Sequence, residues 1–473
     1  MKERYLDVAI IGGGTAGLSA VNEVRKVTEN FMLINDGPDG TTCARVGCMP
    51  SKILIQAAND FYRRHVFAQE GISGSEHLRV DLGKVLQYVR SLRDGFVGGV
   101  LKTLDNLGDR LQHGHARFRE PTMLEVEDHL IQAKRIIIAT GSRPIIPQAW
   151  RSLTDRILTT DTLFEQTELP SPLAVIGLGA VGLEMCQALA RIDVQVTGIG
   201  KDEQLGGLSD PAVSSYIRPI LTQEFPIYTS AAAELDTADN QLTVRFGNNS
   251  LHTEKILASL GRRPNTADLG LECLGLSLND QGLPPCDATT MQVGSLPIFV
   301  AGDVDADHPV LHEAADKGRI AGFNSVQEHP HCFRRRTPLR IVFSEPNIAV
   351  VGQPFSELKD HDIAIGEVRF DNQGRAKIMT ERTGILRIYG DKSNGRILGA
   401  ELAAPRGEHL AHLLAWAVQK DMTVFEILQL PFYHPVIEEG LRTALRALSQ
   451  QVSAKHPTFE LAMCDSAAIS AME

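Results

Sequence analysis

Two glycine-rich turns constrain the fold of this chain more than any other feature, because each stands between an apolar strand-like run and a helix-like stretch. The first turn comprises residues 12–17, Gly-Gly-Gly-Thr-Ala-Gly, and follows the apolar run 7–11. In a dinucleotide site of this kind, Gly12 permits the tight turn, Gly14 lets a pyrophosphate approach the backbone, and Gly17 lets helix and strand pack closely. The amino end of the helix then faces the phosphates.

The same pattern occurs again in the middle of the chain. The apolar run 173–176 leads into Gly177, Gly179 and Gly182, and the helical stretch 183–191 follows. Two dinucleotide-binding folds in one chain suit electron transfer between two nucleotide cofactors. The sequence therefore predicts an α/β protein with two Rossmann-like domains.

The remaining segments predict further strands and a third region. Two apolar runs, 135–141 and 298–303, end in small residues, as strands of an open α/β sheet do. From about residue 337 the pattern becomes that of an α+β domain without a nucleotide fingerprint. The strands expected there include 364–370 and 384–389, and the expected helices are 409–420 and 438–451.

A chain of 473 residues is too long for one core and predicts about three domains. The two fingerprints and the change of pattern near residue 337 set the boundaries. We expect the first nucleotide domain at 1–150, the second at 151–270, a segment returning to the first at 271–336, and the α+β domain at 337–473.

Cys43 and Cys48 stand five positions apart, just downstream of the first glycine turn. Such a pair can close a small disulfide ring that opens and re-forms during turnover, which stores two electrons beside a cofactor. In a reducing compartment a close pair is more often catalytic or metal-binding than structural. No second Cys or His pair nearby offers the remaining ligands of a metal site, so we expect redox chemistry and no metal.

Composition argues against several other functions. The net charge is -11 with acidic and basic residues interspersed, so neither nucleic acid nor a membrane surface is an expected partner. The amino terminus lacks a signal-like pattern, and no run of about 18 apolar residues occurs. The other five cysteines are scattered, unlike a secreted disulfide framework. We therefore expect a soluble cytoplasmic enzyme.

The motifs together resemble the flavoprotein pyridine nucleotide-disulfide oxidoreductases, the family that includes dihydrolipoamide dehydrogenase, glutathione reductase and mercuric reductase. The resemblance covers nearly the whole chain, and the order and spacing of its pieces are more specific than any one piece. It implies that the two Rossmann-like domains bind FAD and NAD and that the α+β domain forms a homodimer. The segments that carry it are 12–17, 43–52, 139–141, 177–182, 260–265, 301–304 and 434–439.

The resemblance assigns roles around the cysteine pair. Cys43 would be the thiol that forms a mixed disulfide with the substrate, and Cys48 the thiol that faces the flavin. Lys52 is similar to the family's lysine near the flavin, where a positive charge stabilises a reduced, anionic ring. Glu184 is similar to the carboxylate that pairs with this lysine, which lowers the cost of burying either charge.

His434 and Glu439 resemble the family's base dyad. A histidine oriented by a carboxylate has a proton affinity suited to deprotonating a dithiol near neutral pH. The resemblance implies that the dyad reaches the redox pair of the other subunit of a homodimer. Val436 stands where the family usually has Thr, which alters hydrogen bonding on the substrate side.

Further FAD contacts are implied by the same resemblance. Asp303 would hold the ribityl or phosphate region, at the carboxyl end of a parallel strand. Pro309 and His312 would pack near the isoalloxazine, and His115 and Ala116 would contact the adenine end. The remaining matched residues are Thr140, Gly141 and Gly261.

The residues that would meet the two riboses depart from the usual pattern. In the first fold the strand ends in Asn35, where an acid is expected, and Asp36 can serve instead. In the second, Gly182 suits NAD, but the position of the acid is Gly200, followed by Lys201, which can attract a 2′-phosphate. We expect NAD, with NADP as the alternative.

The run Pro-Ser-Lys after the cysteine pair favours the dihydrolipoamide dehydrogenase branch, and Cys464 lacks the neighbouring cysteine typical of mercuric reductases. The expected function is therefore that of an FAD-dependent dihydrolipoamide:NAD oxidoreductase, whose partner is a small-molecule dithiol or disulfide or a lipoyl domain. Departures at Gly40-Thr41, Gly200 and Val436 leave open an NAD(P)H-dependent reductase of another disulfide, a quinone or a metal ion. A non-catalytic redox-sensing flavoprotein is the third possibility.

Overall fold

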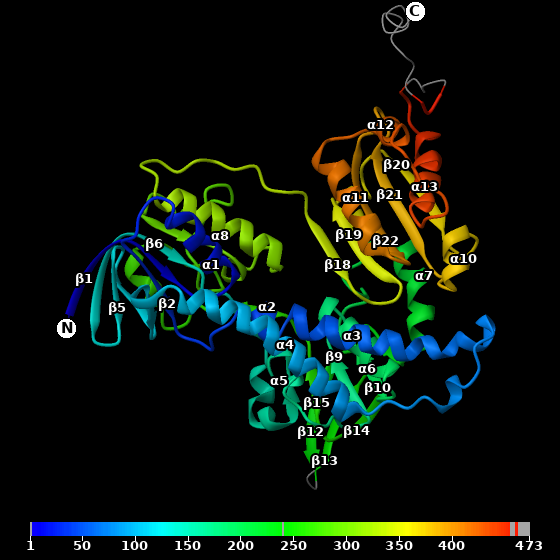
Figure 1. Ribbon diagram of the computed structural model, residues 1–473, viewed down its shortest axis with the longest axis horizontal. Coiled ribbons are helices and arrows are strands. Elements are labelled where there is room, and N and C mark those ends of the chain that lie inside the picture. Colours follow the sequence, from blue (N-terminus) through cyan, green and yellow to red (C-terminus); the bar gives the residue numbers. More distant parts are fainter. Residues whose placement is uncertain (1, 239–240, 455–458, 462–473) are drawn as a thin grey trace, which may run out of the picture. The chain divides into compact units, whose positions relative to one another are not determined.

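The computed structural model describes residues 2–238, 241–454 and 459–461, so Cys464 lies outside the described part. The chain forms two compact units. The described residues of Met1–Leu54, Asp81–Glu168 and Leu260–Arg335 make up the first unit, and those of Ile55–Val80, Leu169–Ser259 and Arg336–Glu473 the second. The α/β architecture with an α+β domain at the carboxyl end confirms the predicted fold class (Figure 1).

The first unit is built on a mainly parallel sheet. Its strands are β1 (Lys2–Ile11), β2 (Phe31–Asn35), β3 (Leu111–His113), β4 (Ala116–Glu120), β5 (Met123–Val126), β6 (His129–Ile138) and β17 (Ile298–Val300). They follow the order β3-β2-β1-β6-β5-β4, and β17 also pairs with β6. Because β1, β2, β6 and β17 run in parallel, their carboxyl ends meet at one edge of the sheet, where ligands of such folds bind.

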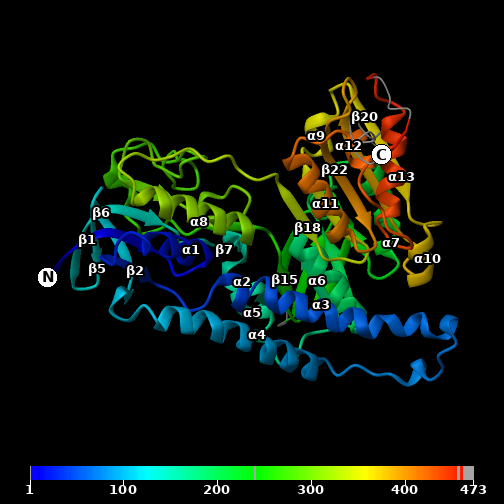
Figure 2. The same cartoon turned by 45° about the horizontal axis from the view of Figure 1, so that its top comes forward.

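Both faces of this sheet are buried along the carboxyl half of β1, which explains why residues 8–11 are all apolar although the strand begins with charged residues. Val8 and Ile10 belong to the core on one face, and Ala9 and Ile11 to the core on the other. Helices α1 (Thr15–Val24) and α8 (Leu311–Ser325) cover the first of these faces. The two helices lie side by side in both Figure 1 and Figure 2.

Helices α1 and α8 approach each other backbone to backbone because α8 carries glycine at the contact. A Cβ atom on Gly318 would lie 2.2 Å from the carbonyl oxygen of Ala16, and one on Gly322 would lie 2.6 Å from that of Ala20. Any side chain at these positions would push the helices apart. The helix that follows the first glycine turn is therefore held firmly against α8.

Shorter elements complete the first unit and lead into the second. They are α2 (Thr42–Arg45), α3 (Cys48–Tyr62), α4 (Leu82–Asp105), β7 (Ser142–Pro144), β8 (Ile157–Leu158), α5 (Thr160–Leu163) and β16 (Arg262–Pro264). Strands β7 and β16 pair in antiparallel fashion although about 120 residues separate them in the chain.

The second unit contains the second glycine turn. Its parallel strands are β9 (Leu173–Ile176), β10 (Val196–Ile199), β11 (Ile227–Tyr228) and β15 (Ile256–Ala258), and its helices are α6 (Ala180–Arg191) and α7 (Pro211–Thr222). Neighbouring strands follow the order β11-β10-β9-β15. An antiparallel sheet of β12 (Ala233–Ala238), β13 (Gln241–Phe246) and β14 (Asn249–Thr253) is attached.

The carboxyl-terminal part of the second unit is the expected α+β domain. Its antiparallel sheet has the order β18-β19-β22-β21-β20, formed by β18 (Leu339–Val342), β19 (Asn347–Gly352), β20 (Ile363–Arg369), β21 (Ile385–Asp391) and β22 (Ile397–Ala404). Its helices are α9 (Phe355–Leu358), α10 (Gly374–Met379), α11 (Gly407–Gln419), α12 (Val424–Leu428) and α13 (Glu439–Ser449). The two predicted strands and two predicted helices are present within a few residues of their expected bounds.

A buried polar network joins this domain to the nucleotide fold of the same unit. Glu401 is fully buried and accepts hydrogen bonds from the backbone N–H groups of Ser209 and Asp210, each at 2.8 Å. Asp210 is equally buried and accepts from Arg387 at 2.8 Å and from the Tyr389 hydroxyl at 2.7 Å. Buried carboxylates are tolerated when they are paired in this way. The network therefore fixes the segment that connects β10 to α7.

No helix in the described part of the chain is long and apolar enough to cross a membrane.

Candidate functional site

The first glycine turn has the shape that a dinucleotide needs. A Cβ on Gly12 would lie 2.2 Å from the Ala139 carbonyl oxygen, and one on Gly17 would lie 1.9 Å from the Gly12 carbonyl oxygen, so only glycine fits at either position. Gly14 has no atom within 4 Å of its Cβ position and is the N-cap of α1. The backbone is therefore open to a diphosphate just where the helix N-terminus favours negative charge.

Asn35 and Asp36, at the end of β2, have different tasks. The side chain of Asn35 accepts a hydrogen bond from the Gly13 N–H at 3.0 Å and donates one to Asp39 at 2.9 Å. It therefore connects the first glycine turn to the turn that follows β2. The Asp36 carboxylate lies 2.6 Å from Nδ1 of His115. Burial lowers the pKa of His115, but the hydrogen bonds to Asp36 and to the Asp268 carbonyl outweigh it, and the net pKa is raised. The structure thus brings together Asp36 and His115, with Ala116 buried beside them.

The segments that follow strands β6, β16 and β17 are joined by a second group of hydrogen bonds. Thr140 donates its hydroxyl to the Asn265 carbonyl at 2.7 Å, and the Asn265 amide donates to the Thr140 carbonyl at 2.9 Å. The Ser142 hydroxyl lies 3.3 Å from the Asp303 carboxylate and accepts from Arg262 at 2.8 Å. Asp303 is therefore held at the carboxyl edge of the sheet.

These contacts include three residues to which the sequence analysis gave no role. Ser142, Arg262 and Asn265 lie in or next to matched segments, but nothing in their spacing indicated that they bind one another. Gly141 and Gly261 lie beside them with φ angles of 68° and 88°, which glycine adopts readily. Pro309 and His312 are exposed on either side of the start of α8.

The two cysteines lie on consecutive helices, and both belong to the first unit. Cys43 is on α2 and Cys48 begins α3, and both are thiols in this structure. The hydrogen bond with Cys48, and then burial, raise the pKa of the Cys43 thiol, while the positive charge of Lys52 opposes this. Cys43 is partly buried and Cys48 is exposed. The two sulfurs are therefore close enough to exchange one proton, as a pair that forms a disulfide must be.

Gly40 and Thr41, which depart from the usual Gly-Gly, have a structural explanation. The Thr41 side chain accepts a hydrogen bond from the Ala44 N–H at 3.2 Å and caps α2, the helix that carries Cys43. A threonine N-cap contributes about 1 kcal/mol to a helix. Gly40 has a φ of 97°, so the turn before the cap still requires glycine.

The second glycine turn repeats the geometry of the first. A Cβ on Gly182 would lie 1.8 Å from the Gly177 carbonyl oxygen, while Gly179 is the N-cap of α6 with no atom within 4 Å of its Cβ position. At the end of β10, the backbone of Gly200 accepts from Ala231 and donates to Tyr228. Lys201 and the acidic residues after it are exposed.

Glu184 lies on α6, directly after the second glycine turn. It is 4% exposed and accepts a hydrogen bond from the Phe343 N–H at 2.8 Å. One turn further, the Gln187 side chain donates to the Glu345 carbonyl and accepts from its N–H, at 2.8 and 2.7 Å. Helix α6 therefore holds the connection between β18 and β19. The predicted pairing of Glu184 with Lys52 joins residues of different units and stays a prediction.

Glu345 provides a prediction about stability. Burial, followed by repulsion from Glu381, raises its pKa from 4.5 to about 7. The folded protein therefore binds this proton more tightly than the unfolded chain, and stability is lost as pH rises from about 4.5 through 7. We expect Glu345→Gln to gain stability relative to the parent as pH rises, by as much as about 3 kcal/mol at pH 8.

Denaturant unfolding at several pH values between 4 and 8 measures this difference. The matched control is Glu357→Gln, because Glu357 is exposed on α9 of the same domain. A difference between Glu345→Gln and the parent that does not grow with pH would contradict the assignment.

His434 and Glu439 are neighbours at the start of α13. Nδ1 of His434 lies 2.9 Å from the Glu439 carboxylate, whose other oxygen accepts from the Val436 N–H at 3.3 Å. The hydrogen bond with His434 lowers the pKa of Glu439. The His434 side chain is 79% exposed, so its ring is open to a substrate or a partner chain.

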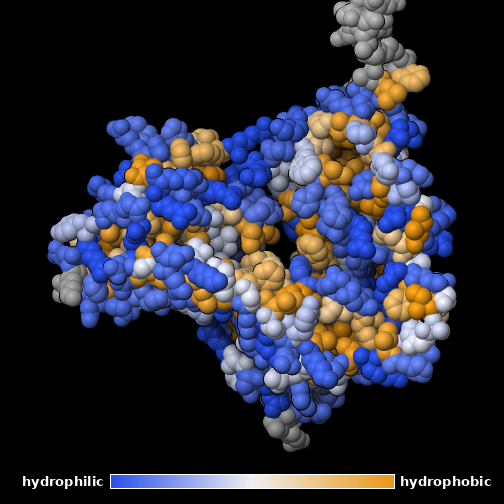
Figure 3. Space-filling model, viewed as in Figure 1, coloured by the Kyte–Doolittle hydropathy of each residue, from blue (hydrophilic) through white to orange (hydrophobic). Residues whose placement is uncertain are grey.

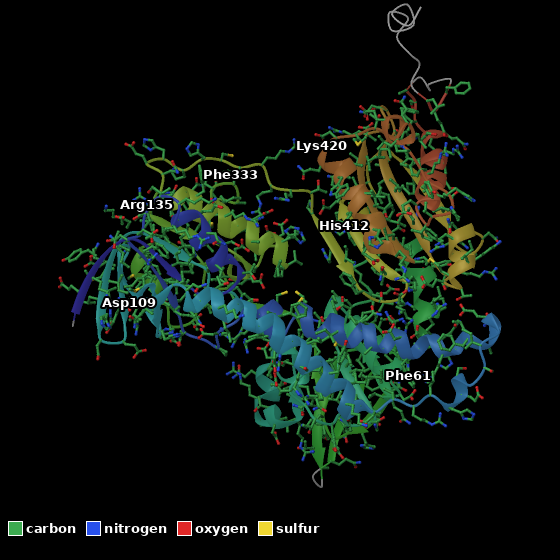
Figure 4. The ribbon with its side chains drawn as sticks, in the orientation of Figure 1. Phe61, Asp109, Arg135, Phe333, His412 and Lys420 are labelled. Carbon is green, nitrogen blue, oxygen red and sulfur yellow. The ribbon has the colours of Figure 1, made fainter. Side chains whose placement is uncertain are left out.

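An apolar cavity of about 480 Å³ lies beside this dyad. Its wall includes Trp416 and Leu413 of α11 and the residues Tyr433 and Val436 on either side of His434. His412 and Lys420, labelled in Figure 4, mark α11 and its end. Apolar residues gather over this part of the molecule in Figure 3. Valine at position 436 fits such surroundings, which a threonine hydroxyl would not.

Sequence comparisons identify the family of this fold. The model of the pyridine nucleotide-disulphide oxidoreductases matches residues 6–318, and that of their dimerisation domain matches residues 339–445. Dihydrolipoyl dehydrogenase of Geobacillus stearothermophilus is 28% identical over 446 residues, which cover 92% of this chain and 94% of the relative. Mercuric reductase of Shigella flexneri is also 28% identical, over 94% of this chain and 81% of the relative.

Solved structures show the same fold. The HOCl-induced flavoprotein disulfide reductase RclA from Escherichia coli, in a Cu(II) complex, aligns with a TM-score of 0.82 and 22% identity, over 94% of this chain and 99% of the other. LpdA from Mycobacterium tuberculosis aligns with a TM-score of 0.81 and 24% identity, over 95% of this chain and all of the other.

Proposed function

Because this chain belongs to the pyridine nucleotide-disulphide oxidoreductase family, whose cofactors are FAD and NAD(P), we propose that it is a dihydrolipoamide:NAD oxidoreductase. The observation that carries the proposal is the hydrogen-bonded pair formed by Cys43 on α2 and Cys48 at the start of α3. Two neighbouring cysteines can form a disulfide that takes two electrons from a dithiol by exchange. The dihydrolipoyl dehydrogenases among the relatives support the choice of substrate.

The dithiol is oxidised by exchange at Cys43. One substrate thiolate attacks Cys43 of the oxidised pair, the bond to Cys48 breaks, and the second substrate thiolate then releases Cys43 as the cyclic disulfide leaves. His434 of the partner subunit takes the substrate proton, while the partner's Glu439 orients the ring. The dimerisation domain indicates the homodimer that this arrangement needs.

The residues near the sheet edge fit FAD. The open backbone at Gly14 and the start of α1 would hold the diphosphate, Asp36 with His115 the adenosine end, and Asp303 the ribityl chain. Lys52 would lie near the ring, with Glu184 as its counter-charge. When bound, FAD supplies the two-electron transfer between the cysteine pair and the nicotinamide.

NAD is the proposed pyridine nucleotide. The open backbone at Gly179 suits its diphosphate, and the exposed acids Asp202 and Glu203 after Lys201 disfavour an added 2′-phosphate. We expect turnover of dihydrolipoamide with NAD to exceed turnover with NADP by at least about tenfold in kcat/KM, which corresponds to about 1.4 kcal/mol.

A second function is favoured by one observation. Val436 lines an apolar cavity where the family has a hydroxyl, and a mercuric reductase is among the relatives. An NAD(P)H-dependent reductase of another disulfide, a quinone or a metal ion is therefore the alternative.

Steady-state kinetics of the FAD-loaded dimer decide between these functions. Dihydrolipoamide is tested with NAD and with NADP, and NADH or NADPH with lipoamide, glutathione disulfide, a benzoquinone and Hg(II). Lipoamide as the substrate with the highest kcat/KM supports the first proposal. A higher value for any other acceptor replaces it with the alternative, and NADPH preference overturns the assignment of NAD.

A further inference from the structure

We propose that Lys317 is a positioning residue for the bound flavin, because it fixes the loop between Asp303 and α8 against α8, the helix that packs on α1. The proposal rests on the FAD site assigned above and concerns only how tightly that site holds the cofactor.

Lys317 is a buried ammonium on α8. Its side chain is 1% exposed, and Nζ lies 2.6 Å from the Asp305 carboxylate and also donates to the Asp307 carbonyl. A buried lysine is costly unless it is paired, and here a carboxylate and a carbonyl share the charge. Both partners lie in the short segment that follows Asp303.

That segment does not have a conformation that its residues favour. Ala306 and His308 have φ angles of 61° and 48°, in the left-handed region that side chains with a Cβ rarely adopt. The Asp305 carboxylate also accepts from the Asp307 N–H at 2.9 Å, which tightens the turn. Burial raises the pKa of Asp305, and Lys317 opposes this shift. The ammonium therefore stabilises both the charge of Asp305 and the shape of the loop.

Helix α8 also contacts α1, the helix that begins at the proposed diphosphate site. Lys317 directly precedes Gly318, whose Cβ position lies 2.2 Å from the Ala16 carbonyl oxygen of α1. Helix α1 begins after Gly14, the proposed diphosphate site. Through α8, the backbone that would hold the diphosphate and the loop next to Asp303 are thus parts of one rigid arrangement, and Lys317 is the link to the loop.

A purely structural ion pair is the competing explanation, and a pair of variants separates the two. Lys317→Met leaves the Asp305 carboxylate buried without its partner, so we expect it to be less stable and to release FAD at least tenfold faster. The double variant Lys317→Met with Asp305→Asn removes both charges and should regain thermal stability. It still lacks the donor to the Asp307 carbonyl, so its release of FAD should remain at least fivefold faster than in the parent.

Arg319→Met is the matched control, because Arg319 lies on the same helix in an exposed ion pair with Asp316 at 2.7 Å. The rate of FAD release is followed by the rise of flavin fluorescence from the loaded dimer, and stability by thermal unfolding. The proposal fails if the double variant holds FAD as the parent does, or if Arg319→Met releases it as fast as the double variant. Neither FAD release nor thermal unfolding involves lipoamide. A failure of the proposed function would be seen in the lipoamide kinetics and would leave these two measurements unchanged.

Discussion

The Cys43→Ser variant is expected to keep its FAD and to lose dithiol turnover by roughly a thousandfold or more, because without the Cys43 sulfur no disulfide is present for the substrate thiolate to attack. Serine is nearly isosteric with cysteine but cannot form a mixed disulfide with the substrate. Cys48→Ser should lose turnover equally, because Cys43 alone cannot close the intramolecular disulfide. The measurement is dihydrolipoamide oxidation by NAD, together with the FAD content of each purified variant.

Electron uptake gives an independent test of the same pair. In anaerobic titration the parent should accept four electrons per bound FAD, and either serine variant only two. Cys273→Ser is the control, because Cys273 is an exposed cysteine elsewhere in the first unit. Lipoamide activity that survives in Cys43→Ser would exclude the proposed exchange at Cys43, and a parent that accepts only two electrons would show that the pair is not redox-active.

The second large effect is expected at the dyad. His434→Gln should slow dithiol oxidation by roughly 10²–10⁴, the usual contribution of a general base, without loss of FAD. Glu439→Gln should lose less, because the carboxylate orients the ring and does not itself take the substrate proton. Reduction of an artificial acceptor by NADH bypasses the substrate dithiol and should be unchanged in both variants.

The pH dependence of the Glu439→Gln effect follows from the lowered pKa of Glu439. Because the hydrogen bond with His434 lowers its pKa, the carboxylate keeps its charge at neutral pH and loses the contact only as pH falls through this lowered value. The loss of kcat/KM in Glu439→Gln relative to the parent should therefore be constant from neutral pH upward. It should shrink only in acid, where the parent's own Glu439 carboxylate becomes protonated.

His409→Gln provides the matched control for the dyad. His409 is an exposed histidine that lies 3.6 Å from Glu408 in the same domain, so the substitution removes a comparable His–Glu contact away from the cavity. Equal losses in His409→Gln and His434→Gln would mean that the effect comes from the domain as a whole and would exclude the base role.

Local pattern was sufficient for the nucleotide folds. Gly12, Gly17 and Gly182 could be identified from sequence because each satisfies a steric requirement of a strand–turn–helix that is complete within about 25 residues. The α+β domain was equally accessible, since the periodicity of its strands and helices is strong. Elements of this kind can be predicted from the local sequence alone.

Long-range polar pairing was not accessible from the sequence. Glu401 binds Ser209 and Asp210 across about 190 residues, and Lys317 binds a loop whose left-handed residues have no sequence signature. Asn35 stands where an acidic residue that binds a ribose was expected, but its side chain connects the first glycine turn to the turn after β2. Thr41 could have been recognised as an N-cap, because threonine directly before a short helix is a typical cap.

The first unit is assembled from distant parts of the chain, and this affects its biosynthesis. A ribosome releases the amino end first, so Ala16 and Ala20 of α1 stay uncovered until Gly318 and Gly322 of α8 have emerged. The stretch Leu169–Ser259 is continuous and is complete well before then. We therefore expect FAD to bind late in synthesis, because a chain that stops before α8 contains Cys43 and Cys48 but lacks the helix that completes the first unit.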